Sequence, residues 1–133
     1  MKALVTGGAG FIGSNLVDKL IKMNWDVVVI DNESAECNEK FYWNPKANNH
    51  KLDICDYENT RKLYDEVDYV FHLAAESRLQ PAIKNPINAV TKNAVGTCTV
   101  LQCSREAKVK KVMYSSTSSA YGLNNYPNYE TVI

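Results

Sequence analysis

Residues 2–13 read KALVTGGAGFIG, and this stretch decides the fold class. Its first five residues form a short, mostly apolar run, which is typical of a strand buried on both faces of a parallel sheet. The glycines that follow stand at the spacing Gly-x-x-Gly-x-x-Gly: Gly7, Gly10 and Gly13. Apolar residues then recur at helical spacing over residues 11–23. A strand, a glycine-rich turn and a helix in direct succession begin a β-α-β unit.

The rest of the sequence continues this alternation. Further strands are expected at residues 26–30, 50–54, 69–73 and 111–115. Further helices are expected at residues 57–66, with Asp56 as the N-cap, and from Asn85 and Pro86 to about Ala107. The polar residues 32–49 are expected to form an irregular connection. The pattern predicts an α/β fold, a Rossmann-type doubly wound parallel sheet of about five strands in the order 3-2-1-4-5.

In such a sheet the ligand lies at the carboxyl ends of the strands where the strand order reverses, here the strands at residues 2–6 and 69–73. No clear sixth strand follows residue 115, and the C-terminal substrate lobe is expected to be lacking. A chain of 133 residues fits one ordinary domain. Residues 1–133 are therefore expected to form a single domain.

The composition limits the class of protein. Lys and Arg together number 15, Asp and Glu together number 15, and 45% of the residues are hydrophobic. This balance excludes the basic excess of a nucleic-acid-binding protein and the polarity of a disordered chain. We find no secretory segment and no apolar run of the roughly 20 residues that a membrane span needs. A cytoplasmic protein with neither a membrane nor a nucleic-acid partner is expected.

The cysteines show no metal-ligand spacing. No Cys-x-x-Cys pair occurs among them, and only two histidines are available to join them as ligands. The expectation is therefore no metal site and four free thiols: Cys37, Cys55, Cys98 and Cys103.

Each glycine of the loop has an expected use. Gly7 and Gly8 permit unusual backbone torsions, and Gly10 lets a pyrophosphate approach the backbone. Gly13 lets the helix and the strand pack closely, and the N-terminus of that helix favours negative charge. A purely structural glycine turn is the alternative, but here a strand, a helix and an acidic residue stand in register with the loop.

That acidic residue is Asp31, at the end of the second expected strand. A carboxylate there accepts hydrogen bonds from the adenosine ribose hydroxyls and repels a 2′-phosphate. We therefore expect NAD rather than NADP as the cofactor, with a loop-capping Asp as the alternative. Asp53 and Ile54 end the third expected strand. They either bind the edge of the adenine or form a common strand-to-helix turn.

Several motifs occur in the order and spacing of the extended short-chain dehydrogenases. They are TGGAGFIG (6–13), Asp31-Asn32, Asp53-Ile54, HLAAES (72–77), Asn93 followed by Gly96-Thr97, and YSSTSSAYG (114–122). Within that family the chain resembles the nucleotide-sugar epimerases and dehydratases, of the type of UDP-galactose 4-epimerase and dTDP-glucose dehydratase. The resemblance extends from Lys2 to about Glu130.

The resemblance implies further site residues. The implied cofactor contacts are Phe11 and Ile12 at the pyrophosphate, Leu73, Ala74 and Ala75 beside the adenosine and ribose, and Asn93 and Ser115 near the nicotinamide. Without a cofactor these residues would be ordinary core, helix-surface and strand-capping residues. Thr117 matches the family's catalytic Ser or Thr, which hydrogen-bonds the sugar hydroxyl that is oxidised.

The sequence departs from the family at the general base, a Tyr whose pKa is lowered by a Lys four residues later. No Lys follows Lys111, and Pro45 disfavours a helix that would present Tyr42 and Lys46 as such a pair. We therefore expect an NAD-binding domain, truncated before the Tyr-x-x-x-Lys motif, with an incomplete catalytic set. Its expected ligands are NAD and a UDP-sugar or other nucleotide sugar. A non-catalytic nucleotide-binding or assembly module is the alternative.

The strand at residues 111–115 is expected to be an unpaired edge of the sheet. Such edges tend to pair with another chain unless they are charged or covered. A homodimer is therefore expected, and the alternative is a monomer in which residues 126–133 fold over the edge.

Overall fold

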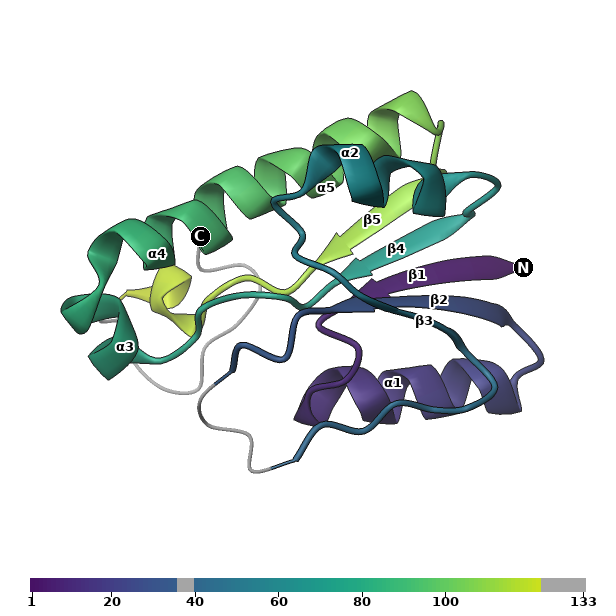
Figure 1. Ribbon diagram of the computed structural model, residues 1–133, viewed down its shortest axis with the longest axis horizontal. Coiled ribbons are helices and arrows are strands. Elements are labelled where there is room, and N and C mark those ends of the chain that lie inside the picture. The colour runs from purple at the N-terminus through teal and green to yellow at the C-terminus, as the bar shows by residue number, and fades with distance from the viewer. Residues whose placement is uncertain (36–39, 123–133) are drawn as a thin grey trace.

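The computed structural model describes residues 1–35 and 40–122 of the chain. At its centre lies one parallel sheet (Figure 1). Its strands are β1 (Lys2–Thr6), β2 (Asp26–Asp31), β3 (Asn48–Lys51), β4 (Tyr69–His72) and β5 (Lys111–Tyr114). They lie in the order β3-β2-β1-β4-β5, and all adjacent pairs are parallel. The predicted Rossmann-type order is confirmed.

Helices cover both faces of the sheet. They are α1 (Phe11–Lys22), α2 (Tyr57–Thr60), α3 (Leu79–Lys84), α4 (Pro86–Val90) and α5 (Gly96–Glu106), with 3₁₀ helices at Arg61–Tyr64 and Ser118–Tyr121. A π-helical turn, Thr91–Val95, joins α4 to α5. The backbone stays helical through both junctions, so residues 86–106 form one continuous helix. In Figure 1, α1 lies on one side of the sheet, and α2 and α5 lie on the other.

Alternate residues of the central strands belong to two different buried clusters. Val5 of β1 shares a cluster with Leu20 of α1, whereas its neighbour Leu4 shares a cluster with Val100 of α5. Because both faces of β1 and β2 are buried, the inner residues of these strands, Ala3–Val5 and Val27–Ile30, are all apolar.

Two helices begin at the residues that were predicted as their caps. The Asp56 carboxylate accepts a hydrogen bond from the Asn59 N–H at 3.2 Å. The Asn85 side-chain oxygen accepts one from the Asn88 N–H at 3.1 Å, and Pro86 follows as the first helical residue. Each cap satisfies a backbone N–H group that has no partner within its helix.

The third strand lies two residues earlier than predicted, at Asn48–Lys51 instead of residues 50–54. It pairs with Val28–Asp31 of β2. Leu52 and Ile54, whose apolar character suggested the later position, follow the strand and pack against the buried cluster beneath α5. Because backbone hydrogen bonds hold an edge strand, its side chains need no apolar pattern.

The long helix exposes much of its apolar surface. Ile87 is 80% exposed and Val90 is 62% exposed, whereas the small residues Ala89 and Gly96 face the core. Helix α3, which the sequence did not predict, adds the exposed side chains Leu79 and Ile83. The small residues on the inner face let the helix approach the sheet closely. The larger apolar residues Ile87 and Val90 lie on the opposite face and are exposed.

No helix within the described residues is long and apolar enough to cross a membrane. The described cysteines Cys55, Cys98 and Cys103 have free thiols, as predicted. Cys37 and the segment 126–133, for which predictions were also made, lie outside the described residues.

Candidate functional site

The glycine loop brings β1, α1 and β4 to within backbone contact of one another. Gly7 has a φ of +70°, and a Cβ atom there would lie 2.8 Å from the backbone nitrogen of Ala74. At Gly13 a Cβ atom would lie only 2.1 Å from the carbonyl oxygen of Gly7. The predicted uses of Gly7 and Gly13 therefore match the geometry. Gly8 differs, because its φ is not positive and its Cβ position is blocked by Val29 of β2.

Helix α1 begins directly after this loop. Gly10 is its N-cap and has an extended backbone with a φ of −76°. The first N–H groups of an α-helix have no partner within the helix and form its positive end. Phe11 and Ile12 are 81% and 70% exposed, so their side chains do not belong to the core. The N-terminus of α1 is thus open to an anionic ligand.

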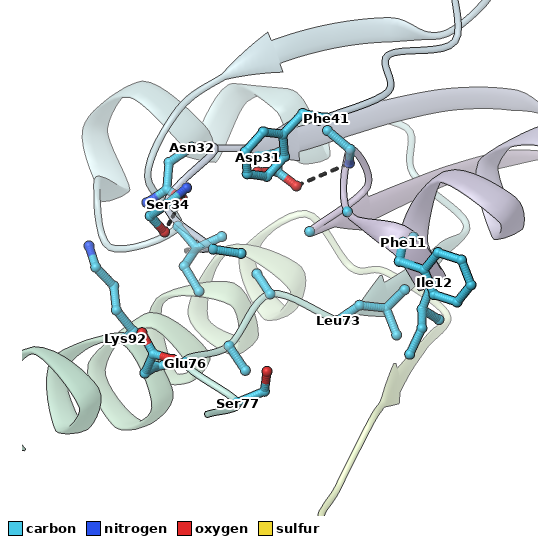
Figure 2. Close-up of a pocket in the computed structure, with 18 of the residues that line it drawn as sticks. Phe11, Ile12, Asp31, Asn32, Ser34, Phe41, Leu73, Glu76, Ser77 and Lys92 are labelled. Carbon is cyan, nitrogen blue, oxygen red and sulfur yellow. Dashed lines mark hydrogen bonds between the residues drawn. The ribbon is translucent and has the colours of Figure 1, made fainter. Parts of the chain in front are cut away.

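A cleft of about 1050 Å³ lies at the carboxyl ends of the strands, next to this helix end (Figure 2). The loop and the end of β2 contribute the predicted cofactor residues Gly7, Gly10, Phe11, Ile12, Gly13, Asp31 and Asn32. Other segments contribute the predicted residues Ile54, Leu73, Ala74, Ala75 and Ser115. One cleft therefore gathers residues from all parts of the described chain.

Asp31 is held by backbone N–H groups on two sides. One carboxylate oxygen accepts a hydrogen bond from Ala9 of the glycine loop at 3.0 Å, and the other accepts one from Glu33 at 2.8 Å. The residue is only 8% exposed but lines the cleft. These bonds fix the carboxylate relative to the loop, and Figure 2 shows it facing the start of α1.

Asp53 does not line the cleft, but it joins three segments that do. It accepts hydrogen bonds from Asn32 (3.2 Å) and from the Cys55 backbone (2.9 Å), and it forms an ion pair with Lys92. Burial acts to raise the pKa of Asp53, but the hydrogen bonds from Lys92 and Cys55 outweigh it, so the pKa lies below its ordinary value. The carboxylate therefore remains charged.

An aromatic segment that the sequence reasoning did not assign to the site forms one wall of the cleft. Phe41 and Tyr42 both line it. The Tyr42 backbone N–H donates to the carbonyl of Ala9 at 3.0 Å, and the Trp43 indole donates to the Glu33 carboxylate at 2.8 Å. The run of three aromatic residues in a polar connection was the available signal.

A buried histidine connects three elements beneath the cleft. The Thr6 hydroxyl oxygen accepts from the N–H groups of Leu73 and Ala74, so its own hydrogen donates to Nδ1 of His72 at 2.7 Å. Nε2 of the ring then carries the proton and donates to Thr97 at 2.9 Å. Burial lowers the pKa of His72, which favours this neutral form. The network holds the backbone that forms the cleft wall after β4.

Asn93 and Thr117 do not line the cleft. The Asn93 amide makes two hydrogen bonds to the backbone of Glu76, accepting at 2.8 Å and donating at 3.0 Å, and so positions the loop after β4. The Thr117 hydroxyl oxygen accepts from the Ser119 N–H at 3.2 Å and caps the last 3₁₀ helix.

The arrangement suits an extended dinucleotide. A positive helix end lies beside a loop of three glycines and one alanine, a fixed carboxylate lies at the end of the next strand, and an apolar and aromatic wall lies beyond it. Phosphates bind favourably at the helix end, ribose hydroxyls donate hydrogen bonds to the carboxylate, and a flat ring packs against the apolar and aromatic wall.

Comparison with known proteins agrees with this geometry. The UDP-glucose 4-epimerase of Lactobacillus helveticus is 35% identical over 125 residues, which are 92% of this chain and 37% of that protein. The UDP-glucose 4-epimerase of Thermotoga maritima, solved with UDP-glucose, superposes with a TM-score of 0.90 at 38% identity and covers 100% of this chain and 44% of that one. The UDP-glucose 4-epimerase of Thermus thermophilus, solved with NAD, superposes with a TM-score of 0.86 at 29% identity. The superposition covers 99% of this chain and 43% of that one.

The chain thus spans about two fifths of the length of these relatives. Residues 3–132 match the model of the NAD dependent epimerase/dehydratase family. The match covers nearly the whole chain, including the glycine loop, Asp31 and the segment after β5. This protein therefore belongs to the NAD-dependent epimerase/dehydratase family.

Proposed function

We propose that this chain binds NAD in the cleft at the ends of β1 and β4, as the cofactor domain of a nucleotide-sugar epimerase or dehydratase. The observation that supports this most directly is the position of Asp31. Its carboxylate is tied to the glycine loop and lines the same cleft as the N-terminus of α1. A dinucleotide can therefore place its pyrophosphate on the helix end and its ribose on the carboxylate.

Each cofactor group then has a proposed partner. The pyrophosphate contacts Gly7, Gly10 and Gly13 and the N–H groups of Phe11 and Ile12. Asp31 and Asn32 contact the hydroxyls of the adenosine ribose, and Asp53 and Ile54 lie beside the adenine. Leu73, Ala74 and Ala75 line the ribose side, and Asn93 and Ser115 lie toward the nicotinamide. Residues 1–133 are proposed to form one NAD-binding domain.

The proposed second ligand is a nucleotide sugar. The relative from Thermotoga maritima was solved with UDP-glucose, and a UDP-sugar is the class that we propose here. Thr117 is the proposed catalytic contact to the sugar hydroxyl. Its oxygen already accepts the Ser119 N–H, so its own hydrogen remains to be donated.

Titration calorimetry with NAD and NADP tests the cofactor assignment. We expect saturable binding of NAD and at least about tenfold weaker binding of NADP, because the Asp31 carboxylate repels a 2′-phosphate. Asp31→Asn keeps the shape of the side chain and removes its charge, so this variant should narrow the difference between the two cofactors. No saturable heat with NAD at millimolar concentration would contradict the proposed function.

We also propose that the chain forms a homodimer. Exposed apolar residues on neighbouring helices support this proposal: Leu79, Ile83, Ile87, Val90 and Leu101. Strand β5 also forms one edge of the described sheet, and its last residue, Tyr114, is 57% exposed. Exposed apolar side chains that gather on one part of a protein surface commonly mark an interface, and a twofold dimer is the commonest closed assembly.

Light scattering at micromolar concentration tests this assembly. The wild type is expected to have twice the mass of one chain, and Ile87→Lys is expected to be monomeric. The change places a charge on a side chain that is 80% exposed, so the fold should be retained. Met23→Lys, at the end of α1 and 51% exposed, is the matched control and should remain dimeric. A wild type with the mass of one chain would disprove the dimer.

A further inference from the structure

Four hydrogen bonds form a closed ring at the rim of the cleft. Ala9 takes part twice: its N–H donates to the Asp31 carboxylate at 3.0 Å, and its carbonyl accepts from the Tyr42 N–H at 3.0 Å. The indole of the next residue, Trp43, donates to the Glu33 side chain at 2.8 Å. The Glu33 N–H then donates to the other Asp31 oxygen at 2.8 Å. The ring therefore joins the glycine loop, the end of β2 and the aromatic segment.

The members of the ring differ in their access to a ligand. Ala9, Asp31 and Tyr42 line the cleft, whereas Glu33 and Trp43 do not. Any effect of these last two residues on a bound ligand therefore passes through the first three. Trp43 also packs against the buried cluster between the sheet and α1, so its indole is a fixed donor.

The Glu33 carboxylate is held at both of its oxygens. One accepts from Trp43, and the other forms an ion pair with Lys51 at the end of β3. The hydrogen bonds from Lys51 and Trp43 hold the pKa of Glu33 below its ordinary value, so the side chain stays charged. The Lys51 side chain is 66% exposed, and solvent weakens such an ion pair. The partly buried indole bond is therefore the stronger restraint on Glu33.

The backbone of Glu33 needs this restraint. Its φ is +56°, in the left-handed region that residues with a side chain adopt rarely and at an energetic cost. In this conformation the Glu33 N–H donates to the Asp31 carboxylate. The side-chain contacts of Glu33 thus stabilise an unfavourable backbone conformation, and that conformation in turn fixes Asp31.

We propose that Glu33 is a positioning residue of the cleft: through the ring it fixes the Asp31 carboxylate and the aromatic wall before a dinucleotide binds, and so strengthens the preference for NAD over NADP. This inference rests on the proposed binding of NAD. A cleft that is ordered beforehand loses less conformational entropy on binding, so its affinity is higher. A fixed Asp31 also cannot turn away from a 2′-phosphate, so NADP is excluded more strictly.

Titration calorimetry with NAD and NADP tests the role of the Glu33 side chain. Glu33→Met has a similar length but accepts no hydrogen bond, so NAD binding should weaken about tenfold and the difference between the two cofactors should narrow. Glu33→Gln loses the charge but keeps an oxygen that accepts from Trp43, so both affinities should stay within about twofold of the wild type. Equal losses in both variants would mean that only the charge matters, and would contradict the inference.

Trp43→Phe removes the same hydrogen bond from its donor side and should reproduce the effect of Glu33→Met on both affinities. Because either change opens the same ring, the double variant should bind NAD no more weakly than the weaker of the two single variants. Losses that add in the double variant would show that the two residues act separately, and would overturn the inference. Circular dichroism checks each fold. If Glu33→Met does not fold, the two affinities of Trp43→Phe decide.

Glu66→Met is the matched control. Glu66 also has a positive φ, +61°, but it is exposed in the turn before β4 and does not line the cleft. This variant should bind both cofactors like the wild type. If Glu33→Met also binds both like the wild type, Glu33 does not position the site, while the proposed NAD binding still holds. If the wild type binds no NAD, the proposed function and this inference are both wrong.

Discussion

Gly13→Ala is expected to destabilise the protein by at least about 4 kcal/mol and to leave much of it unfolded, since whole domains are stable by only about 5–15 kcal/mol. The added Cβ atom would lie 2.1 Å from the carbonyl oxygen of Gly7 and 2.7 Å from the Cα atom of Gly8. Both are backbone atoms, so no side-chain rotation relieves the contact. The loop would have to move away from α1, and urea unfolding followed by tryptophan fluorescence measures the cost.

Gly96→Ala is the matched control for this variant. It makes the same chemical change in another helix, but the new Cβ atom would meet side-chain atoms of Ile54, at 2.5 and 2.9 Å, and no backbone atom closer than 3 Å, so a side-chain shift can relieve the contact. Alanine also has the higher helix propensity, so a change of no more than about 1 kcal/mol is expected. Equal unfolding midpoints for Gly13→Ala and the wild type would show that the loop does not need this close approach.

Gly10→Val is expected to abolish NAD binding while leaving the protein folded. Gly10 has an extended backbone with a φ of −76°, which valine adopts without strain. Its backbone hydrogen bonds to Gly7 and Ser14 can remain. The valine side chain would occupy the part of the cleft that is proposed for the pyrophosphate, and a loss of affinity of at least about 100-fold, or about 2.7 kcal/mol, is expected.

Calorimetry with NAD measures this loss, and circular dichroism checks the fold. Asn15→Val, one turn later on the exposed face of α1, adds the same side chain outside the cleft and should bind NAD like the wild type. Unchanged affinity in folded Gly10→Val would mean that the pyrophosphate does not lie on this loop.

The sheet order and the part of the cleft beside the glycine loop could be predicted from the sequence because their determinants are local. A buried strand and four glycines stand within residues 2–13, the helix begins at Phe11, and Asp31 directly ends the next strand. Such features depend on backbone sterics and on alternation along the chain, which a sequence displays directly. The third strand was misplaced because β3 is an edge strand with polar side chains.

The alanines after β4 were predicted as cleft residues, but the buried contacts that hold them were not. Thr6 and His72 are 66 residues apart, and neither belongs to a pattern that indicates a hydrogen bond between them. The aromatic wall at Phe41 likewise depends on a backbone bond to the glycine loop, which has no sequence signature.

The fold class, the glycine loop and the acidic residue at the end of β2 could be read directly from the residues, because each follows from short-range backbone geometry. The ion pair of Lys92 with Asp53 and the outward position of Ile87 could be found only from the folded molecule. These orientations depend on a π-helical turn and on how closely the helix approaches the sheet. Both result from packing between segments far apart in the chain, and one extra residue in a turn changes the direction of a side chain by about 100°.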